Sequence, residues 1–194
     1  MAEIYLLRHG ETQWSKSGQH TGLTDIPLTD NGVKQALALK KMITHEQFQA
    51  VFCSPLERAK QTCNSCGLLD KAIITNDLLE WNYGDYEGIT TKEIHEYDPK
   101  WTIFTKDPPN GETSIQVANR ADRLIKESSK YEGKIAFFSS GHFLRALAAR
   151  WLGFQVSFGA YLTLSTASLS ILSFEHDNRV IKEWNSISHS KKSA

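Results

Sequence analysis

Short apolar segments alternate with helix-like patterns along this chain, and this alternation limits the possible folds more than any other feature. The apolar segments cover residues 4–7, 50–53, 72–75 and 134–139, and they are short enough to be strands. Between and after them, helix patterns cover residues 29–44, 56–66, 113–131 and 143–152. Strands that alternate with helices form mostly parallel sheets covered on both faces. We therefore predict an α/β fold, a three-layer α/β/α sandwich with a mostly parallel central sheet.

The remaining segments complete this prediction. Residues 10–28 are rich in Gly, Ser, Thr and Gln and indicate a long loop, which in a compact domain is usually functional. Residues 167–174 and 180–184 are expected to pair as a hairpin around Asp177 and Asn178. No repeat or linker divides the chain, so we expect one domain over residues 1–187 and a flexible tail over 188–194.

The helix patterns also predict which faces are buried. In the helix expected at residues 29–44, the predicted buried stripe consists of Val33, Ala36, Leu37 and Ile43. In the helix that begins after Thr113, the predicted stripe consists of Ile115, Ala118, Ala121 and Ile125. On the last helix, we expect Arg145 and Arg150 to form salt bridges rather than to bind substrate.

Charge and cysteine content exclude several classes of function. Lys plus Arg total 22 and Asp plus Glu total 22, a balance that argues against binding to nucleic acid or to an anionic membrane. No apolar run approaches the roughly 20 residues of a membrane span, and the N-terminus lacks the basic start of a signal peptide. Cys53, Cys63 and Cys66 are an odd set, which favours reduced, buried thiols and a cytoplasmic protein.

Chemically active residues follow the predicted strands at the edge where α/β sheets bind ligands. Arg8 and His9 follow the first strand, and Arg58 lies just after the second. Glu80 comes after the third strand, and His142 comes after the fourth. Each of these residues alone has an ordinary structural explanation, but their placement at one edge favours a shared site.

Phosphoryl transfer is the chemistry that fits this set of residues. Two guanidinium groups can hold a phosphate dianion, a neutral imidazole can attack phosphorus, and a carboxylic acid can protonate the leaving oxygen. The sequence has no Walker lysine motif, no G-x-G-x-x-G and no residues at metal-ligand spacing. We therefore expect a covalent route that uses neither a metal nor another cofactor.

The same residues resemble a known family. Residues 6–12, Leu-Leu-Arg-His-Gly-Glu-Thr, are similar to the opening signature of the histidine phosphatase superfamily, which is related to phosphoglycerate mutase. Residues 54–62 resemble its second arginine motif, residues 80–88 its catalytic acid motif, and residues 111–113 and 141–145 follow in family order. Residues 14–25 and 80–88 are most similar to the sedoheptulose-bisphosphatase-like branch. The resemblance implies a phosphoglycerate mutase-like fold.

The resemblance also implies roles for individual residues. His9 is expected to be the phosphohistidine nucleophile, and Glu80 the general acid and then the base. Arg8 and Arg58 are expected to clamp the transferred phosphoryl group. The loop positions that match phosphate or substrate contacts are Ser15, Thr21 and Gly22.

One position departs from the family pattern. The family has a second catalytic histidine immediately before Gly141, and this chain has Ser140 there, with His142 two positions later. Three hypotheses follow: Ser140 donates a neutral hydrogen bond while His142 supplies the second imidazole, Ser140 serves alone in a slower enzyme, or the chain binds without turnover. We favour the first, because Ser140, Gly141 and His142 lie at a strand-to-helix turn, where backbone N–H groups bind anions.

The sequence thus predicts a cytoplasmic phosphatase for a small phosphorylated metabolite, such as a sugar phosphate or bisphosphate. A phosphoglycerate mutase is the first alternative, but the short segment 89–110 favours an open pocket in which water hydrolyses the phosphohistidine. A weakened phospho-ligand binding protein is the second, because of Ser140. No signal in the sequence specifies an oligomeric state.

Overall fold

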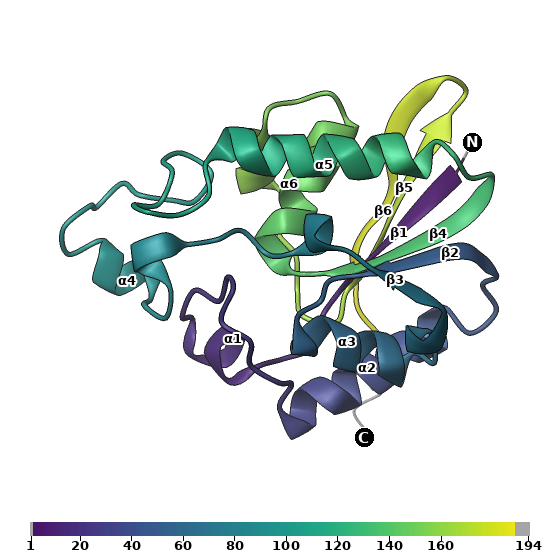
Figure 1. Cartoon of the computed structure of the whole chain (residues 1–194), viewed down its shortest axis with the longest axis horizontal. Helices are drawn as coiled ribbons and strands as arrows, with labels where there is room; N and C mark the ends of the chain where they lie inside the picture. The colour runs from purple at the N-terminus through teal and green to yellow at the C-terminus, as the bar shows by residue number, and fades with distance from the viewer. Residues whose placement is uncertain (1, 189–194) are drawn as a thin grey trace, which may run out of the picture.

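A single mixed sheet organises the computed structural model, which describes residues 2–188 (Figure 1). Within these residues the strand order is β3-β2-β4-β1-β5-β6. The parallel strands are β1 (Ala2–Arg8), β2 (Phe48–Cys53), β3 (Ala72–Ile74) and β4 (Gly133–Ser139). The antiparallel strands are β5 (Leu169–Glu175) and β6 (Asn178–Ser186), which form the expected hairpin.

Helices cover both faces of this sheet, as predicted. They are α1 (Gln13–Ser17), α2 (Asp30–Met42), α3 (Glu57–Ser65), α4 (Thr91–Ile94), α5 (Ser114–Ser128) and α6 (Gly141–Trp151). Four 3₁₀ turns accompany them in the described residues: η1 (Leu69–Lys71), η2 (Asn76–Leu78), η3 (Gly84–Tyr86) and η4 (Val156–Tyr161). In Figure 1, α5 and α6 lie on one side of the sheet and α2 and α3 on the other.

The strand β1 shows how the sequence produces the two layers of core. Side chains alternate across a strand, so Ile4 and Leu6 join the core beneath α5 and α6. Tyr5 and Leu7 join the opposite core, which contains Leu39 at α2. A strand buried on both faces has to be apolar throughout, and the predicted three-layer α/β/α sandwich is confirmed.

The predicted buried stripes of α2 and α5 are partly wrong. Val33 and Leu37 are 39% and 49% exposed, because α2 turns Gly32, Ala36 and Leu39 toward the sheet. Ile115 is 72% exposed, and the buried face of α5 consists of Val117, Arg120, Ala121, Leu124, Ile125 and Ser128. The spacing of apolar residues permitted more than one stripe, and packing against the sheet selected the one observed.

The long loop predicted at residues 10–28 contains the short helix α1. Thr12 begins it through a capping box, in which its hydroxyl accepts from the Ser15 amide and the Ser15 hydroxyl accepts from the Thr12 amide. Its polar sequence shows no apolar periodicity, so the pattern did not reveal it.

Three further expectations concern the chain as a whole. The three cysteines are free and buried, as expected. Among residues 2–188, no helix is both long and apolar enough to cross a bilayer. Residues 189–194 of the expected tail lie outside the described residues.

Candidate active site

Three chain segments that carry predicted site residues begin side by side at the carboxyl ends of β1, β2 and β4. Arg8 is paired with Ser139 at the ends of β1 and β4, and the His9 amide donates to the Ser139 carbonyl oxygen over 3.0 Å. The Ser54 amide, at the end of β2, donates to the Phe138 carbonyl oxygen over 3.0 Å. The chain segments that follow these strands therefore leave the sheet side by side.

A cleft of about 280 Å³ opens at this edge. Its lining includes the predicted site residues Arg8, His9, Ser15, Thr21, Glu80, Gly141 and His142. Residues that sequence reasoning did not place there also line it, namely Gly18, Gln19, His20, Tyr83, Thr91, Arg145 and Leu164. The predicted site residues Arg58, Gly22 and Ser140 are buried and do not line the cleft.

His9 is a buried imidazole whose proton position follows from its partner. Its Nδ1 lies 2.7 Å from the carbonyl oxygen of Gly10, which can only accept a hydrogen bond. Burial, and then the charges of Arg58 and Arg8, hold the pKa of His9 well below its usual value. The ring is therefore neutral near pH 7, with the hydrogen on Nδ1 and a free lone pair on Nε2.

Two buried guanidinium groups lie near His9. Arg58 is fully buried and donates to the carbonyl oxygens of Thr24 at 3.0 Å, Gly22 at 2.8 Å and Thr21 at 3.2 Å. Arg8 donates to the Leu164 carbonyl oxygen. Burial lowers the pKa of both arginines. Since ordinary guanidinium pKa values are above 12, both remain cations near neutral pH.

Gly22 supports Arg58 rather than lining the cleft. Its carbonyl oxygen accepts from Arg58, and its amide donates to Glu87 Oε1 over 2.8 Å. A Cβ at this position would lie only 2.6 Å from the Trp81 carbonyl oxygen, so the close packing requires glycine.

Several buried polar atoms near this site have no hydrogen-bond partner among the described residues. They are Arg8 Nε, Arg58 Nε and Ser140 Oγ. Buried donors without partners are rare, and they commonly mark a place where a ligand supplies the acceptor. Two of these atoms belong to guanidinium cations whose charges lower the pKa of His9, so this part of the site is suited to an anion.

Glu80 is held by backbone amides at the start of α6. Its Oε1 accepts from the amides of Phe143 at 2.7 Å and Trp81 at 2.9 Å, and its Oε2 accepts from the amide of His142 at 3.0 Å. First-turn amides of a helix have no partners within the helix, so a carboxylate is a natural acceptor for them. The His142 amide, which lies at the turn expected to bind an anion, therefore binds Glu80.

His142 is oriented by a phenol. Its Nδ1 is hydrogen-bonded to the Tyr83 hydroxyl. Burial, and then the charges of Glu80 and Glu87, raise the pKa of Tyr83 well above its usual value, so the phenol keeps its proton. Burial, and then Arg145, lower the pKa of His142, so its ring is neutral, and its hydrogen lies on Nε2 when the phenol donates to Nδ1.

Arg145 differs from the expectation of a salt bridge. Arg150 forms one with Asp122, whose oxygens lie 2.9 and 3.0 Å away, but within residues 2–188 no carboxylate pairs with Arg145. Instead it donates to the Gly159 carbonyl oxygen over 3.0 Å and lies 4.5 Å above the ring of Phe104. Its spacing of four residues from Gly141 was a usable signal, because it places both on one face of the helix.

His20 is a second residue that the sequence did not reveal. Its ring lies 4.7 Å from that of Tyr83, and burial lowers its pKa to about 4, against a smaller opposing effect of Glu87. It faces the cleft as a neutral ring near pH 7. No cluster of three or more His, Cys, Asp or Glu side chains with the geometry of a metal site occurs among the described residues.

Comparison with known proteins gives a consistent result. The sequence profile of the Histidine phosphatase superfamily (branch 1) matches residues 4–187. An acid phosphatase of Mycobacterium tuberculosis is 39% identical over 91% of this chain and 88% of its own length. The sedoheptulose 1,7-bisphosphatase of Saccharomyces cerevisiae is 37% identical over 78% of this chain and 68% of its own length.

A solved structure shows the same fold. The product of a Mycobacterium tuberculosis open reading frame superimposes with a TM-score of 0.93 at 37% identity, covering 97% of this chain and 99% of that protein.

Proposed function

The chain belongs to the histidine phosphatase superfamily and is a phosphatase, and we propose that it hydrolyses a small phosphorylated metabolite through a phosphohistidine at His9, without a metal. One observation carries this proposal. A neutral imidazole, with Nδ1 held by the Gly10 carbonyl, lies near Arg8 and Arg58, whose buried Nε atoms have no hydrogen-bond partner among the described residues. These groups suit attack on a phosphate dianion by Nε2.

The first chemical step forms a bond between His9 Nε2 and phosphorus and breaks the bond from phosphorus to the ester oxygen. The leaving oxygen takes a proton from Glu80, which leaves Glu80 ionised. Glu80 Oε2 accepts a single amide hydrogen bond, so it retains a lone pair on which this proton can reside.

The second step hydrolyses the intermediate. Ionised Glu80 takes a proton from water, whose oxygen attacks phosphorus while the bond to Nε2 breaks. Orthophosphate leaves, His9 regains its neutral form and Glu80 its proton. In both steps Arg8 and Arg58 stabilise the equatorial oxygens of the transferred group.

Ser140 and His142 replace the family's second histidine in this proposal. Ser140 supplies a neutral hydroxyl donor, because its Oγ is buried at the start of α6 without a partner among the described residues. His142 supplies a neutral Nε2–H, set by the Tyr83 hydroxyl on Nδ1. Loop residues Ser15 and Thr21, with Gly141, line the cleft and complete the substrate contacts.

Arg145 supports a substrate with a second anionic group. It lines the cleft, and no carboxylate among the described residues neutralises it. A sugar bisphosphate presents such a group at a distance from the one that is transferred, and a yeast relative carries the name sedoheptulose 1,7-bisphosphatase. A sugar bisphosphate is therefore our preferred substrate class.

A phosphate-release screen over sugar mono- and bisphosphates, with and without a metal chelator, tests this function. We expect turnover that the chelator leaves unchanged and that His9→Ala lowers by at least about 10³-fold with the fold intact. The exposed His45→Ala serves as the matched control. Binding of phosphate esters without turnover would instead support the alternative suggested by Ser140, a protein that only binds.

A further inference from the structure

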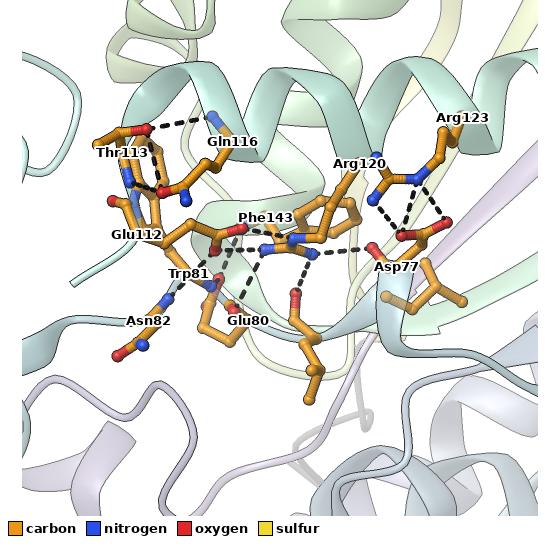
Figure 2. Close-up of polar contacts among 12 residues, drawn as sticks. Asp77, Glu80, Trp81, Asn82, Glu112, Thr113, Gln116, Arg120, Arg123 and Phe143 are labelled. Atoms are coloured by element: carbon orange, nitrogen blue, oxygen red, sulfur yellow. Dashed lines mark hydrogen bonds and ion pairs between the residues drawn. The ribbon is translucent and has the colours of Figure 1, made fainter.

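Arg120 is a buried cation whose guanidinium lies against the backbone of Glu80 (Figure 2). Its Nε and Nη2 each lie 2.7 Å from one oxygen of Glu112, which makes a two-point ion pair. Its Nη1 donates to the carbonyl oxygens of Asp77 at 2.8 Å and Leu79 at 2.9 Å. Its Nη2 also lies 3.4 Å from the carbonyl oxygen of Glu80 itself. One guanidinium thus binds three carbonyls of the segment that ends at Glu80.

The same guanidinium contacts a residue that holds the Glu80 side chain. Arg120 Cζ lies 4.4 Å from the ring centre of Phe143, and the Phe143 amide donates to Glu80 Oε1 over 2.7 Å. These contacts form a ring. Arg120 contacts the Glu80 backbone, the Glu80 side chain accepts from the Phe143 amide, and the Phe143 ring contacts Arg120. Arg120 therefore contacts the Glu80 backbone directly, and it contacts one of the three residues whose amides hold the Glu80 carboxylate.

Glu112 extends this support to the residues after Glu80. Its backbone carbonyl accepts from Trp81 Nε1 over 2.7 Å, and its amide donates to the Asn82 carbonyl oxygen over 2.9 Å. Residues 79–83 belong to no helix or strand, so their position depends on such contacts. Figure 2 shows Glu112 between Arg120 and this segment.

We propose that Arg120, with Glu112 as its counter-ion, is the positioning residue for the general acid Glu80. The inference rests on the role that the proposed function gives to Glu80. Proton transfer requires the carboxyl to lie within roughly 3 Å of the leaving oxygen, and small displacements are costly in rate. A lysine cannot replace Arg120, because its compact ammonium lacks the planar fork that serves a carboxylate and several carbonyls at once.

The test compares two esters that differ in their need for an acid. Glycerol phosphate releases an alkoxide and needs the proton from Glu80, whereas p-nitrophenyl phosphate releases a stable phenolate and scarcely needs it. We expect Arg120→Lys and Glu112→Gln to lower kcat for glycerol phosphate by roughly 10- to 100-fold and kcat for p-nitrophenyl phosphate by less than about threefold. KM should change little, because Arg120 does not line the cleft.

A neighbouring arginine provides the matched control. Arg123 lies on the same helix and pairs with the Asp77 carboxylate at 2.6 Å, but it is largely exposed, and among the described residues it forms no hydrogen bond with Leu79 or Glu80. Arg123→Gln should leave both rates unchanged. In Glu80→Gln, the added Arg120→Lys change should produce no further loss for glycerol phosphate, because the group that it positions is already absent.

A second measurement is independent of activity. The NMR signal of the Phe143 amide reports its hydrogen bond to Glu80, and we expect it to shift in Arg120→Lys and Glu112→Gln but not in Arg123→Gln. An unchanged Phe143 signal, or equal slowing of the two esters, would overturn the positioning role. If the wild-type chain hydrolysed neither these esters nor any sugar phosphate of the screen, the proposed function would fail, and the amide signal would still decide whether Arg120 positions Glu80.

Discussion

The Tyr83 hydroxyl is hydrogen-bonded to Nδ1 of His142, so this contact and the position of the hydrogen on the neutral His142 ring depend on each other. Tyr83 belongs to the acid-motif segment and His142 to the first turn of α6, 59 positions apart. His142 lines the cleft, and Ser140, two positions earlier, stands where the family pattern has a second histidine.

This relationship predicts an order of effects among variants. His142→Ala should lower kcat by about 10²-fold, as loss of a donor to the transition state does, and Ser140→Ala should lower it by less. Tyr83→Phe should lower kcat by up to about tenfold, because the hydrogen is then free to move to Nδ1. Ser140→His should bring little benefit, because the two imidazoles would compete for one space. Steady-state rates on one substrate check this order, and wild-type rates in both alanine variants would place neither residue at the transferred phosphate.

Glu80→Gln should slow alkyl esters far more than aryl esters. A glutamine cannot release a proton to an alkoxide, and general acid catalysis contributes about 10²- to 10⁴-fold. The measurement is the ratio of kcat for p-nitrophenyl phosphate to kcat for glycerol phosphate, with the exposed Glu132→Gln as the control. An unchanged ratio would remove Glu80 from the acid role.

Arg145→Gln should raise KM for sugar bisphosphates but not for monophosphates. Loss of a charge-assisted contact to a second phosphate is expected to raise KM for a sugar bisphosphate by about 10- to 100-fold. The KM for p-nitrophenyl phosphate should stay within about twofold, since that ester has no second anionic group. Arg150→Gln, which disrupts the ion pair with Asp122 and the hydrogen bond to the Phe154 carbonyl oxygen outside the cleft, is the matched control. Equal effects on both substrates would contradict a second-anion site.

The buried histidines predict a loss of stability in mild acid. Burial lowers the pKa of His20 from 6.5 to about 4, so between these values the unfolded chain binds a proton that the folded chain does not. The contribution of His20 is therefore fully present above about pH 6.5 and is lost as the pH falls toward 4. His9 and His142, whose pKa values burial also lowers, act in the same direction.

Urea unfolding at several pH values measures this effect. The free energy of unfolding should fall between about pH 7 and about pH 4.5. In His20→Gln this fall should be smaller than in the wild type by on the order of 1–2 kcal/mol, because part of the proton uptake on unfolding is removed. His176→Gln changes an exposed turn residue and should follow the wild-type curve. If the free energy of unfolding depended on pH equally in His20→Gln and in the wild type, this assignment would be wrong.

The strands and the residues that follow them could be predicted from the sequence. Alternation of side chains along β1 requires apolar residues at every position of a strand covered on both faces, and this requirement is local. Arg8, His9, Glu80 and His142 then reach one cleft because parallel strands end at the same edge.

The helix faces and the pairing of buried charges could not be predicted in this way. Arg120 lies in the apolar face of α5, and only its contacts with Glu112 and with a segment some 40 residues earlier in the chain explain how its charge is buried there. Arg145 and Arg150 look alike in sequence, yet one meets Asp122 and the other lines the cleft.

The sequence by itself therefore determined the strands, the sheet edge and the identity of the chemical groups, because residue periodicity and strand direction act over a few neighbouring positions. Tertiary structure alone decided which donor meets which acceptor. Three contacts illustrate this: the bond between Tyr83 and His142, the amides at the start of α6 that hold the Glu80 carboxylate, and the Arg120 guanidinium on the Glu80 carbonyl. Each joins groups that are distant along the chain. A hydrogen bond forms only when such groups approach to about 3 Å, and that distance is set by the packing of the whole domain.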